Sequence, residues 1–327
     1  MVRVLKRAVL ALSVFVAFIT AAQQACAQGY PNRPVRLIVP YPPGGATDVL
    51  ARAAAQRLSE NVGKQVLVEN RAGGGGNIAA DSVAKSPADG YTLLFGGTPT
   101  LAINSSLYAK LPFDPLTDFA PIGLAGSLAL TMIVSANSPV HSVNDLIALA
   151  KSKPGQLNYA SSGVGGTTFL AMEMFKTAAG VQITHIPYKG TTAGMADMIG
   201  GSIQVMFDSW VTSDPLVKAG KLRYLGVASA KRSALNPDVP TIIESGFPGL
   251  EVSVWHGLVA PAGTPPDIIN KLSVELMKVT ALPEYRERLA TIGMEPLTTT
   301  PSQFAAYIRS ETAKWAQVVR NSGVKAE

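Results

Sequence analysis

Cysteine is nearly absent from this sequence. Its 327 residues include one cysteine, Cys26, and it lies in an N-terminal segment that we expect to be removed. A mature chain without cysteine can form no disulfide, no thiolate metal site and no cysteine nucleophile. The three histidines, His141, His185 and His256, lie far apart with no carboxylate or cysteine at the spacing of a metal site, so we assign none of them chemistry. The sequence therefore predicts no bound metal.

Motifs for nucleotides, nucleic acids and hydrolytic catalysis are also missing. The four glycines at 73–76 are not followed by Gly-Lys-Ser/Thr and lack the dinucleotide spacing, so we expect a loop that lines a cleft. No run of lysine and arginine with interleaved aromatic residues indicates nucleic acid. Neither a Gly-x-Ser-x-Gly elbow nor a histidine pair is present to support catalysis. These absences predict no cofactor, no nucleic-acid partner and no enzymatic activity.

The first 27 residues have the pattern of an export signal. Three basic residues precede an apolar run over residues 8–19, and Ala25-Cys26-Ala27 provides a small-x-small cleavage site. The run is shorter than the roughly 20 apolar residues of a membrane span. We expect cleavage between Ala27 and Gln28 and release into the periplasm, with a retained anchor or a lipid-modified Cys26 as alternatives. Cleavage lowers the net charge from +6 to about +3, so the mature chain is only mildly basic.

About 300 mature residues are too many for one small core and fit two domains. We expect strands over 35–40, 65–69, 91–95, 131–134, 157–160, 182–186, 203–207, 222–227 and 252–259, and helices over 47–58, 78–84, 143–151, 167–179, 191–199, 266–280 and 301–321. This alternation predicts an α/β protein with parallel-rich sheets flanked by helices. We assign residues 1–27 to the signal peptide, 28–125 to a first lobe, 126–250 to a second lobe and 251–327 to a return to the first lobe. A ligand cleft then lies between the two lobes.

One motif occurs twice: a strand is followed by a glycine-rich turn, and a helix begins directly after the turn. We expect threonine to cap each of these helices. Helix starts carry unpaired backbone N–H groups and a partial positive charge of about half a unit. Two such turns facing each other can hold a small anion without lysine or arginine. The predicted ligand residues are Tyr41, Gly44, Gly45, Ala46 and Thr47 in the first turn, and Ser161, Ser162, Gly163, Gly166, Thr167 and Thr168 in the second.

Four further side chains follow strand ends at the same predicted edge. Thr98 and Thr100 are candidate ligand hydroxyls, with capping of the turn around Pro99 as the alternative. Tyr188 and Asp208 are candidates from the second lobe, although Asp208 could instead cap the next helix. Ligands collect at the carboxyl ends of parallel strands, which is why we include these residues.

Two residues near the turns have competing structural roles. Asp48 lies in the first turn of a helix and Arg52 follows four residues later, so we predict a structural ion pair rather than ligand contact. Trp210 either flanks the apolar part of the ligand or packs between the lobes.

Six sequence strings, in order along the chain, resemble the substrate-binding receptors of tripartite tricarboxylate transporters, the Bug family. They are Tyr41-Pro42-Pro43-Gly44-Gly45-x-x-Asp48-x-x-Ala51-Arg52, Val68-Glu69-Asn70-Arg71-x-Gly73, Ala88-Asp89-Gly90-Tyr91-Thr92-Leu93, His185-Ile186-Pro187-Tyr188-Lys189-Gly190, Val239-Pro240-Thr241-x-x-Glu244-x-Gly246 and Trp255-x-Gly257-Leu258-x-Ala260-Pro261-x-Gly263-Thr264-Pro265. The resemblance implies a periplasmic solute-binding fold of type II. It also implies delivery of a small carboxylate to a two-component membrane permease.

In this family, the turns that match 41–48 and 161–168 hold a carboxylate through backbone amides and bridging waters. The second turn departs from the pattern, because many members carry a histidine where this chain has Thr167-Thr168-Phe169-Leu170. We expect a monomer whose lobes draw together on the ligand, and no ion pair between the ligand and Lys189. An extracytoplasmic sensor is the alternative function and an enzyme the weaker one. Dicarboxylates, aromatic acids and amino acids stay open as ligands.

Overall fold

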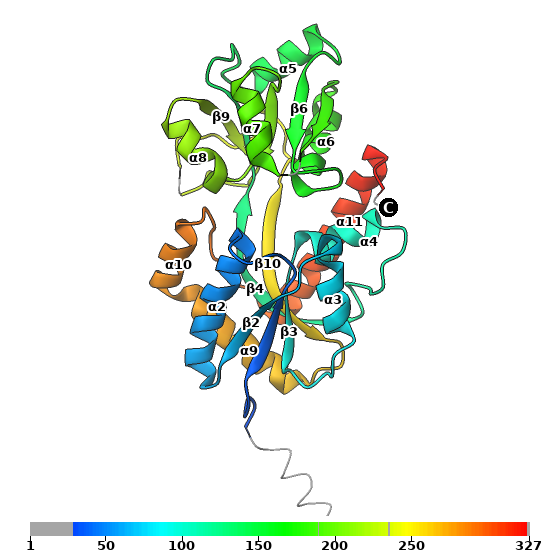
Figure 1. The fold of residues 1–327 in the computed structure, drawn as a ribbon, viewed down its shortest axis with the longest axis vertical. Coiled ribbons are helices and arrows are strands. Elements are labelled where there is room, and N and C mark those ends of the chain that lie inside the picture. Colours follow the sequence, from blue (N-terminus) through cyan, green and yellow to red (C-terminus); the bar gives the residue numbers. More distant parts are fainter. Residues whose placement is uncertain (1–28, 189, 235, 326–327) are drawn as a thin grey trace, which may run out of the picture.

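The computed structural model describes residues 29–188, 190–234 and 236–325, so the predicted signal segment, its cleavage point at Gln28 and Lys189 lie outside the described residues. The described chain forms two lobes stacked along the long axis, each built on a five-stranded sheet with helices around it (Figure 1). The expected two-lobe α/β fold is confirmed. None of the described helices is long and apolar enough to cross a membrane.

The sheet of the first lobe has the strand order β2-β1-β3-β10-β4. Its strands are β1 (Val35–Val39), β2 (Val66–Asn70), β3 (Thr92–Gly97), β4 (Phe119–Ala129) and β10 (Ser253–Pro261). β1 pairs in parallel with β2 and β3, whereas β10 runs antiparallel to β3 and β4. The parallel strands carry the first glycine-rich turn at their carboxyl ends.

The sheet of the second lobe has the order β7-β6-β8-β5-β9. Its strands are β5 (Thr131–Ser135), β6 (Asn158–Ser161), β7 (Thr184–Pro187), β8 (Val205–Asp208) and β9 (Leu222–Val227). β6 is parallel to β7 and β8, and β5 is antiparallel to β8 and β9. Both sheets are therefore mixed rather than mostly parallel. Every antiparallel pair includes β5 or β10, the strands that follow the two passages of the chain between the lobes.

The structure contains all the expected helices and several that the sequence did not predict. Lobe 1 contains α2 (Ala46–Val62), η1 (Gly74–Gly76), α3 (Asn77–Ala84), η2 (Pro99–Ile103), α4 (Asn104–Leu107), α9 (Pro266–Ala281), α10 (Pro283–Ala290) and α11 (Pro301–Ser322). Lobe 2 contains α5 (Val143–Ser152), α6 (Thr167–Ala179), α7 (Thr191–Ile199) and α8 (Trp210–Lys218). The sequence interpretation missed α4, α8, α10 and strand β4. Pro215 inside α8, and Pro121 with two glycines inside β4, obscure the usual periodicity.

The chain passes between the lobes twice, at Leu130 and near Val252 (Figure 1). The two crossings are hydrogen-bonded through Ala228: Leu130 N–H donates to Val252 O at 3.2 Å, Ala228 N–H to Leu130 O at 2.8 Å and Val252 N–H to Ala228 O at 2.8 Å. After the second crossing, α9 and α11 pack on β4 of lobe 1, and α11 also reaches α6 of lobe 2. The carboxyl ends of β1 and β3 therefore lie on a lobe that is joined to lobe 2 by two short chain crossings and by the contact between α11 and α6.

Candidate functional site

The first glycine-rich turn ends at the start of α2, with Gly45 in the N-cap position. The expected threonine cap is wrong, because Thr47 lies inside the first turn and no side chain caps the helix. Ala46 and Thr47 occupy the first helical positions, where backbone N–H groups have no intrahelical acceptor. Gly44 and Gly45 are exposed, and a Cβ added at Gly45 would meet nothing nearer than Pro42 O at 4.0 Å. The turn thus presents open backbone at a positive helix end.

Beneath this turn lies a polar network centred on the buried carboxylate of Asp48. Asp48 Oδ2 accepts the Gly44 N–H at 2.9 Å and Arg52 Nε at 3.0 Å, while Oδ1 accepts Asn70 Nδ2 at 2.8 Å. Burial alone favours a raised pKa for the Asp48 carboxyl, but the hydrogen bonds from Arg52, Gly44 and Asn70 outweigh it and lower the pKa. The predicted Asp48–Arg52 ion pair is confirmed. Because the Gly44 amide is already bonded to Asp48, it cannot also donate to a ligand in this arrangement.

Tyr41 enters the same network through its backbone. Asn70 Nδ2 donates to the Tyr41 carbonyl at 3.0 Å, which ties the turn to the end of β2. The Tyr41 side chain is half-buried, and desolvation raises the pKa of its phenol, so the hydroxyl stays protonated. Tyr41 therefore shapes the turn in this structure.

Thr47 contacts a residue from the other end of the sequence. Its Oγ1 lies 2.9 Å from Nε2 of His256 on β10. His256 is 2% exposed, and its ring stacks on Phe95 with centroids 5.8 Å apart. Burial lowers the pKa of His256 to about 4, so the imidazole is neutral at ordinary pH. The sequence interpretation assigned His256 no function, and only its place in the Trp-x-Gly motif could have drawn attention to it.

The remaining edge of lobe 1 is built from the tetraglycine loop and the segment after β3. A Cβ at Gly76 would lie 2.5 Å from Thr100 and 3.1 Å from Pro40, so the loop packs directly behind the α2 turn. Asn104 Nδ2 holds the loop by donating to Gly75 O at 3.1 Å and to Asn77 Oδ1 at 2.6 Å. Glycine is required here because the φ angles of Gly75 and Gly76 are positive.

Thr98 and Thr100 are fully buried, and their hydroxyls have internal partners. Thr98 Oγ1 accepts the Trp255 N–H at 2.9 Å, which ties β3 to β10. Thr100 Oγ1 accepts the Gly97 N–H at 3.1 Å and closes the turn around Pro99. The capping alternative therefore describes Thr100, whereas Thr98 makes a strand-to-strand contact that neither interpretation anticipated.

The second glycine-rich turn has Gly166, not threonine, as the N-cap of α6. Ser161 is fully buried; its Oγ accepts the Gly163 N–H at 3.2 Å and lies 2.7 Å from His185 Nε2. Thr168 Oγ1 accepts the Ser162 N–H at 3.0 Å and lies 3.0 Å from Ser162 Oγ. These bonds close the loop from within, and they leave the half-buried Thr167 in the first turn of the helix.

Asp208 lies at the end of β8, between the starts of α7 and α8. Burial raises the pKa of its carboxyl, opposed by hydrogen bonds from Thr212, the Ser209 amide and Thr191. The Thr212 hydroxyl donates to Asp208 Oδ2 at 2.5 Å. Asp208 thus joins the first turns of two helices, but it is not the cap of α8, because Ser209 occupies the N-cap position and no side chain caps that helix.

Tyr188, also predicted at this edge, donates its hydroxyl to Asp197 Oδ2 at 2.6 Å. That hydrogen bond raises the pKa of Tyr188 to about 12. The phenol is therefore protonated at ordinary pH, and it donates its proton to Asp197 rather than to a ligand.

The two lobes touch beside the second turn. A Cβ at Gly165 would lie 2.8 Å from Leu107, which ends α4 of lobe 1. On the other side, a Cβ at Gly293 would lie 3.1 Å from the Cβ of Trp210 on lobe 2. Trp210 is buried and packs edge-on against Tyr224 of its own lobe, with ring centroids 4.2 Å apart, while its Cβ faces Gly293 of lobe 1.

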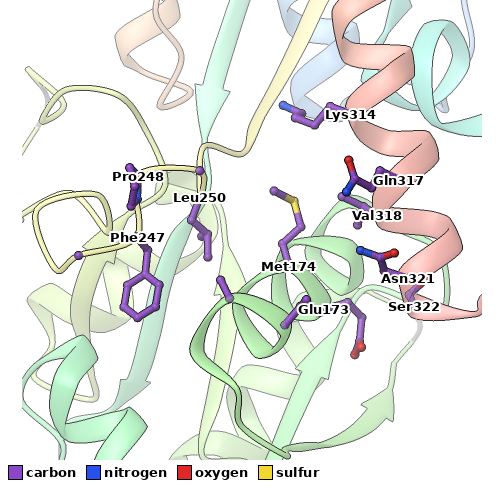
Figure 2. Close-up of a pocket in the computed structure, with 14 residues that line it drawn as sticks. Glu173, Met174, Phe247, Pro248, Leu250, Lys314, Gln317, Val318, Asn321 and Ser322 are labelled. Atoms are coloured by element: carbon purple, nitrogen blue, oxygen red, sulfur yellow. The ribbon is translucent and has the colours of Figure 1, made fainter.

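Two cavities lie away from these turns. One, of about 470 Å³, is formed by α6, residues 246–250 and the last turns of α11; Figure 2 shows Met174 between Leu250 and α11. The other, of about 630 Å³, lies around Trp210, Lys231 and Tyr307. Among residues 29–188, 190–234 and 236–325, no group of three or more metal-ligating side chains is clustered.

The chain matches known proteins over most of its length. The family model described as the tripartite tricarboxylate transporter family receptor matches residues 50–324. Rpa4515 of R. palustris, solved with adipate, is 39% identical with a TM-score of 0.78, covering 91% of this chain and 99% of that one.

Two further solved structures are similar. The periplasmic binding protein BugD is 34% identical with a TM-score of 0.75, covering 91% of this chain and 100% of its own. MatC (Rpa3494) from Rhodopseudomonas palustris, solved with bound malate, is 30% identical with a TM-score of 0.74, covering 89% of this chain and 100% of its own.

Proposed function

Because the chain belongs to the tripartite tricarboxylate transporter receptor family, we propose that it binds a small dicarboxylate between its lobes and delivers it to a membrane permease. The family resemblance predicted from sequence motifs is confirmed, and family and fold are those of solute-binding receptors, not enzymes. Similar periplasmic binding proteins support the expected location in the periplasm.

The open backbone at the start of α2 is the observation that carries the proposed binding mode. The amides of Ala46 and Thr47 are free of intrahelical acceptors, and the exposed Gly45 leaves space for an anion to approach them. Asp48 does not repel such an anion strongly, because Arg52 and two further hydrogen bonds satisfy its carboxylate. We infer that one carboxylate of the ligand binds here.

The second turn supplies the opposing wall. Thr167 starts α6, whose 13 residues give it a helix dipole directed toward the turn. Gly165 meets Leu107 of lobe 1, so this turn and the α4 region approach each other across the lobes. Adipate in Rpa4515 and malate in MatC support a dicarboxylate as the ligand class.

Calorimetry on the purified mature protein tests this proposal. Adipate, malate and succinate are titrated, with hexanoate and the corresponding dimethyl esters as controls. We expect at least one dicarboxylate to bind and its diester to lose binding, since the ester removes the charge that the helix start stabilises. Binding of esters and acids with equal affinity, or of none of them, contradicts the proposal.

Delivery to a permease is tested separately, by uptake of the cognate acid in cells that lack the gene. Complementation with the natural sequence restores uptake if the receptor serves a transporter. Unchanged uptake together with a lost transcriptional response to the acid identifies the sensor alternative instead.

A further inference from the structure

We propose that His256 is a positioning residue for the ligand, holding the Thr47 hydroxyl so that its proton points to the bound carboxylate. This inference rests on the proposed function, because it assigns a role at the α2 end of that site. It concerns a residue from β10, about 200 positions away from Thr47 in the sequence.

The contact is well enclosed on the histidine side. His256 pairs with Gly97 across the antiparallel β10–β3 ladder. A Cβ at Gly97 would lie 2.8 Å from the imidazole carbon Cδ2, so only glycine leaves room for the ring. Phe95 stacks on the ring at 5.8 Å with an angle of 10° between the planes. The ring is therefore fixed, and only Nε2 faces Thr47.

The hydrogen bonds around the ring assign its tautomer. A neutral imidazole has one N–H donor and one acceptor nitrogen. Nδ1 of His256 is buried and has no partner among the described residues. A buried N–H without an acceptor is rarer and costlier than an unused lone pair, so the proton belongs on Nε2. Nε2–H then donates to Thr47 Oγ1.

This polarity determines what the Thr47 hydroxyl does. Its oxygen accepts from His256, and that is the one partner the described residues give it. The hydroxyl proton therefore needs a different acceptor. Thr47 also supplies one of the free amides at the start of α2, so a carboxylate oxygen at those amides lies within reach of the same side chain. Burial holds the pKa of His256 at about 4, so the ring is neutral at physiological pH and carries a single N–H, the one assigned to Nε2.

The first test is the tautomer of the unliganded natural protein, measured by nitrogen-15 NMR of its histidine rings. His256→Gln identifies the signal of this ring. We expect the protonated nitrogen to be Nε2, and a ring protonated at Nδ1 overturns the inference. This measurement does not depend on any ligand.

The second test is a mutant cycle on the affinity for the dicarboxylate found by calorimetry. Thr47→Val keeps the shape of the side chain and removes the hydroxyl, and we expect an affinity loss of about tenfold or more. His256→Phe keeps the stacked ring and removes the donor. It should weaken binding several-fold in the natural background and not at all in Thr47→Val. His256→Gln retains an N–H at this distance along the side chain and should restore most of the affinity.

Additive losses in the double variant, or His256→Gln behaving like His256→Phe, overturn the positioning role. Thermal unfolding of each variant separates affinity changes from misfolding. If the natural protein binds no dicarboxylate, both the proposed function and this inference fail, whereas an Nδ1 proton with binding intact removes the inference alone.

Discussion

Asp48 determines which backbone amides of the α2 turn are free to bind a ligand. Its carboxylate accepts the Gly44 N–H, so a ligand is left with the amides of Ala46 and Thr47. Gly45 governs access to them, since it has no side chain and its backbone is extended, at φ −74° and ψ 166°. That conformation is open to β-branched residues, so a substitution here tests access without backbone strain.

We expect Gly45→Val to weaken dicarboxylate binding by about a hundredfold or more, because each of the two lost hydrogen bonds to a charged group contributes about 1.5–3 kcal/mol. Stability should change little, since the new Cβ meets no close neighbour. Gly249→Val is the matched control, at another open position remote from α2. Calorimetry and thermal unfolding measure both effects, and full affinity in Gly45→Val would rule out amide binding at α2.

His256 predicts an acid sensitivity of its own. In the unfolded chain this imidazole takes up a proton near its ordinary pKa of 6.5, but in the folded chain it does so only near 4. Between these values the unfolded state binds more protons, so stability falls as pH falls from 6.5 toward 4, by about 1.4 kcal/mol per pH unit at most. Urea unfolding measures the free energy of unfolding at pH 7 and at pH 4.5. Its decrease between these two pH values should be about 2 kcal/mol smaller in His256→Gln than in the natural protein. Equal losses in both proteins would show that this ring does not titrate as inferred.

At the scale of elements, the strand-to-helix units could be predicted because each has a local signature. The run 35–39 is apolar and rich in β-branched residues apart from Arg36, and the Asp48–Arg52 spacing places both side chains on one helix face. Strand β4 could not be predicted, since its partner β10 comes more than a hundred residues later. Thr98 was a candidate ligand residue because it follows a strand end, and nothing in the sequence shows that its hydroxyl instead accepts the Trp255 N–H.

Within the Asp48 network, the buried carboxylate should contribute more to stability than its exposed partner Arg52. Asp48→Ala removes the acceptor for Gly44, Arg52 and Asn70 and should lower the free energy of unfolding by about 1–3 kcal/mol. Arg52→Ala should cost less than about 1 kcal/mol, because its side chain is 51% exposed. Urea denaturation compares them; a larger effect for Arg52→Ala would mean that the ion pair, not the buried acceptor, stabilises the turn.

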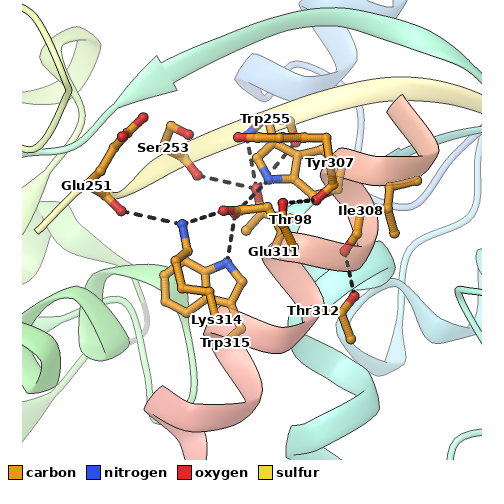
Figure 3. A network of polar contacts seen from close by, with 11 residues as sticks. Thr98, Glu251, Ser253, Trp255, Tyr307, Ile308, Glu311, Thr312, Lys314 and Trp315 are labelled. Atoms are coloured by element: carbon orange, nitrogen blue, oxygen red, sulfur yellow. Dashed lines mark hydrogen bonds and ion pairs between the residues drawn. The ribbon is translucent and has the colours of Figure 1, made fainter. Parts of the chain in front are cut away.

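At the scale of the whole molecule, α11 secures the second crossing between the lobes. Figure 3 shows the indoles of Trp255 and Trp315 directed at the buried carboxylate of Glu311, to which each donates at 3.0 Å. Lys314 pairs with the same carboxylate and also donates to Glu251 O at 3.4 Å. Trp255 belongs to β10, so this network holds the helix to the strand that leaves the crossing.

Glu311→Ala should lower the free energy of unfolding by about 2–5 kcal/mol, since it leaves two buried indole N–H groups without an acceptor. Glu244→Ala is the control: it removes an exposed carboxylate paired with Arg232, and stability should change little because solvent screens exposed ion pairs. Denaturant unfolding followed by tryptophan fluorescence measures both. Equal small effects would show that the network does not stabilise the crossing.

The lobe arrangement leads to a prediction about motion. Only the segments at Leu130 and near Val252 carry the described chain between the sheets, and hinges are built from such short segments. Because the proposed ligand contacts come from both lobes, a bound dicarboxylate favours a closed arrangement. We therefore expect a smaller radius of gyration in small-angle scattering at saturating ligand than without it. Gly45→Val at the same concentration should show no change, which separates closure from a general salt effect. Identical curves for the free and saturated natural protein would contradict closure. They would mean that the lobes are already closed without ligand, held by contacts such as the one between Gly165 and Leu107.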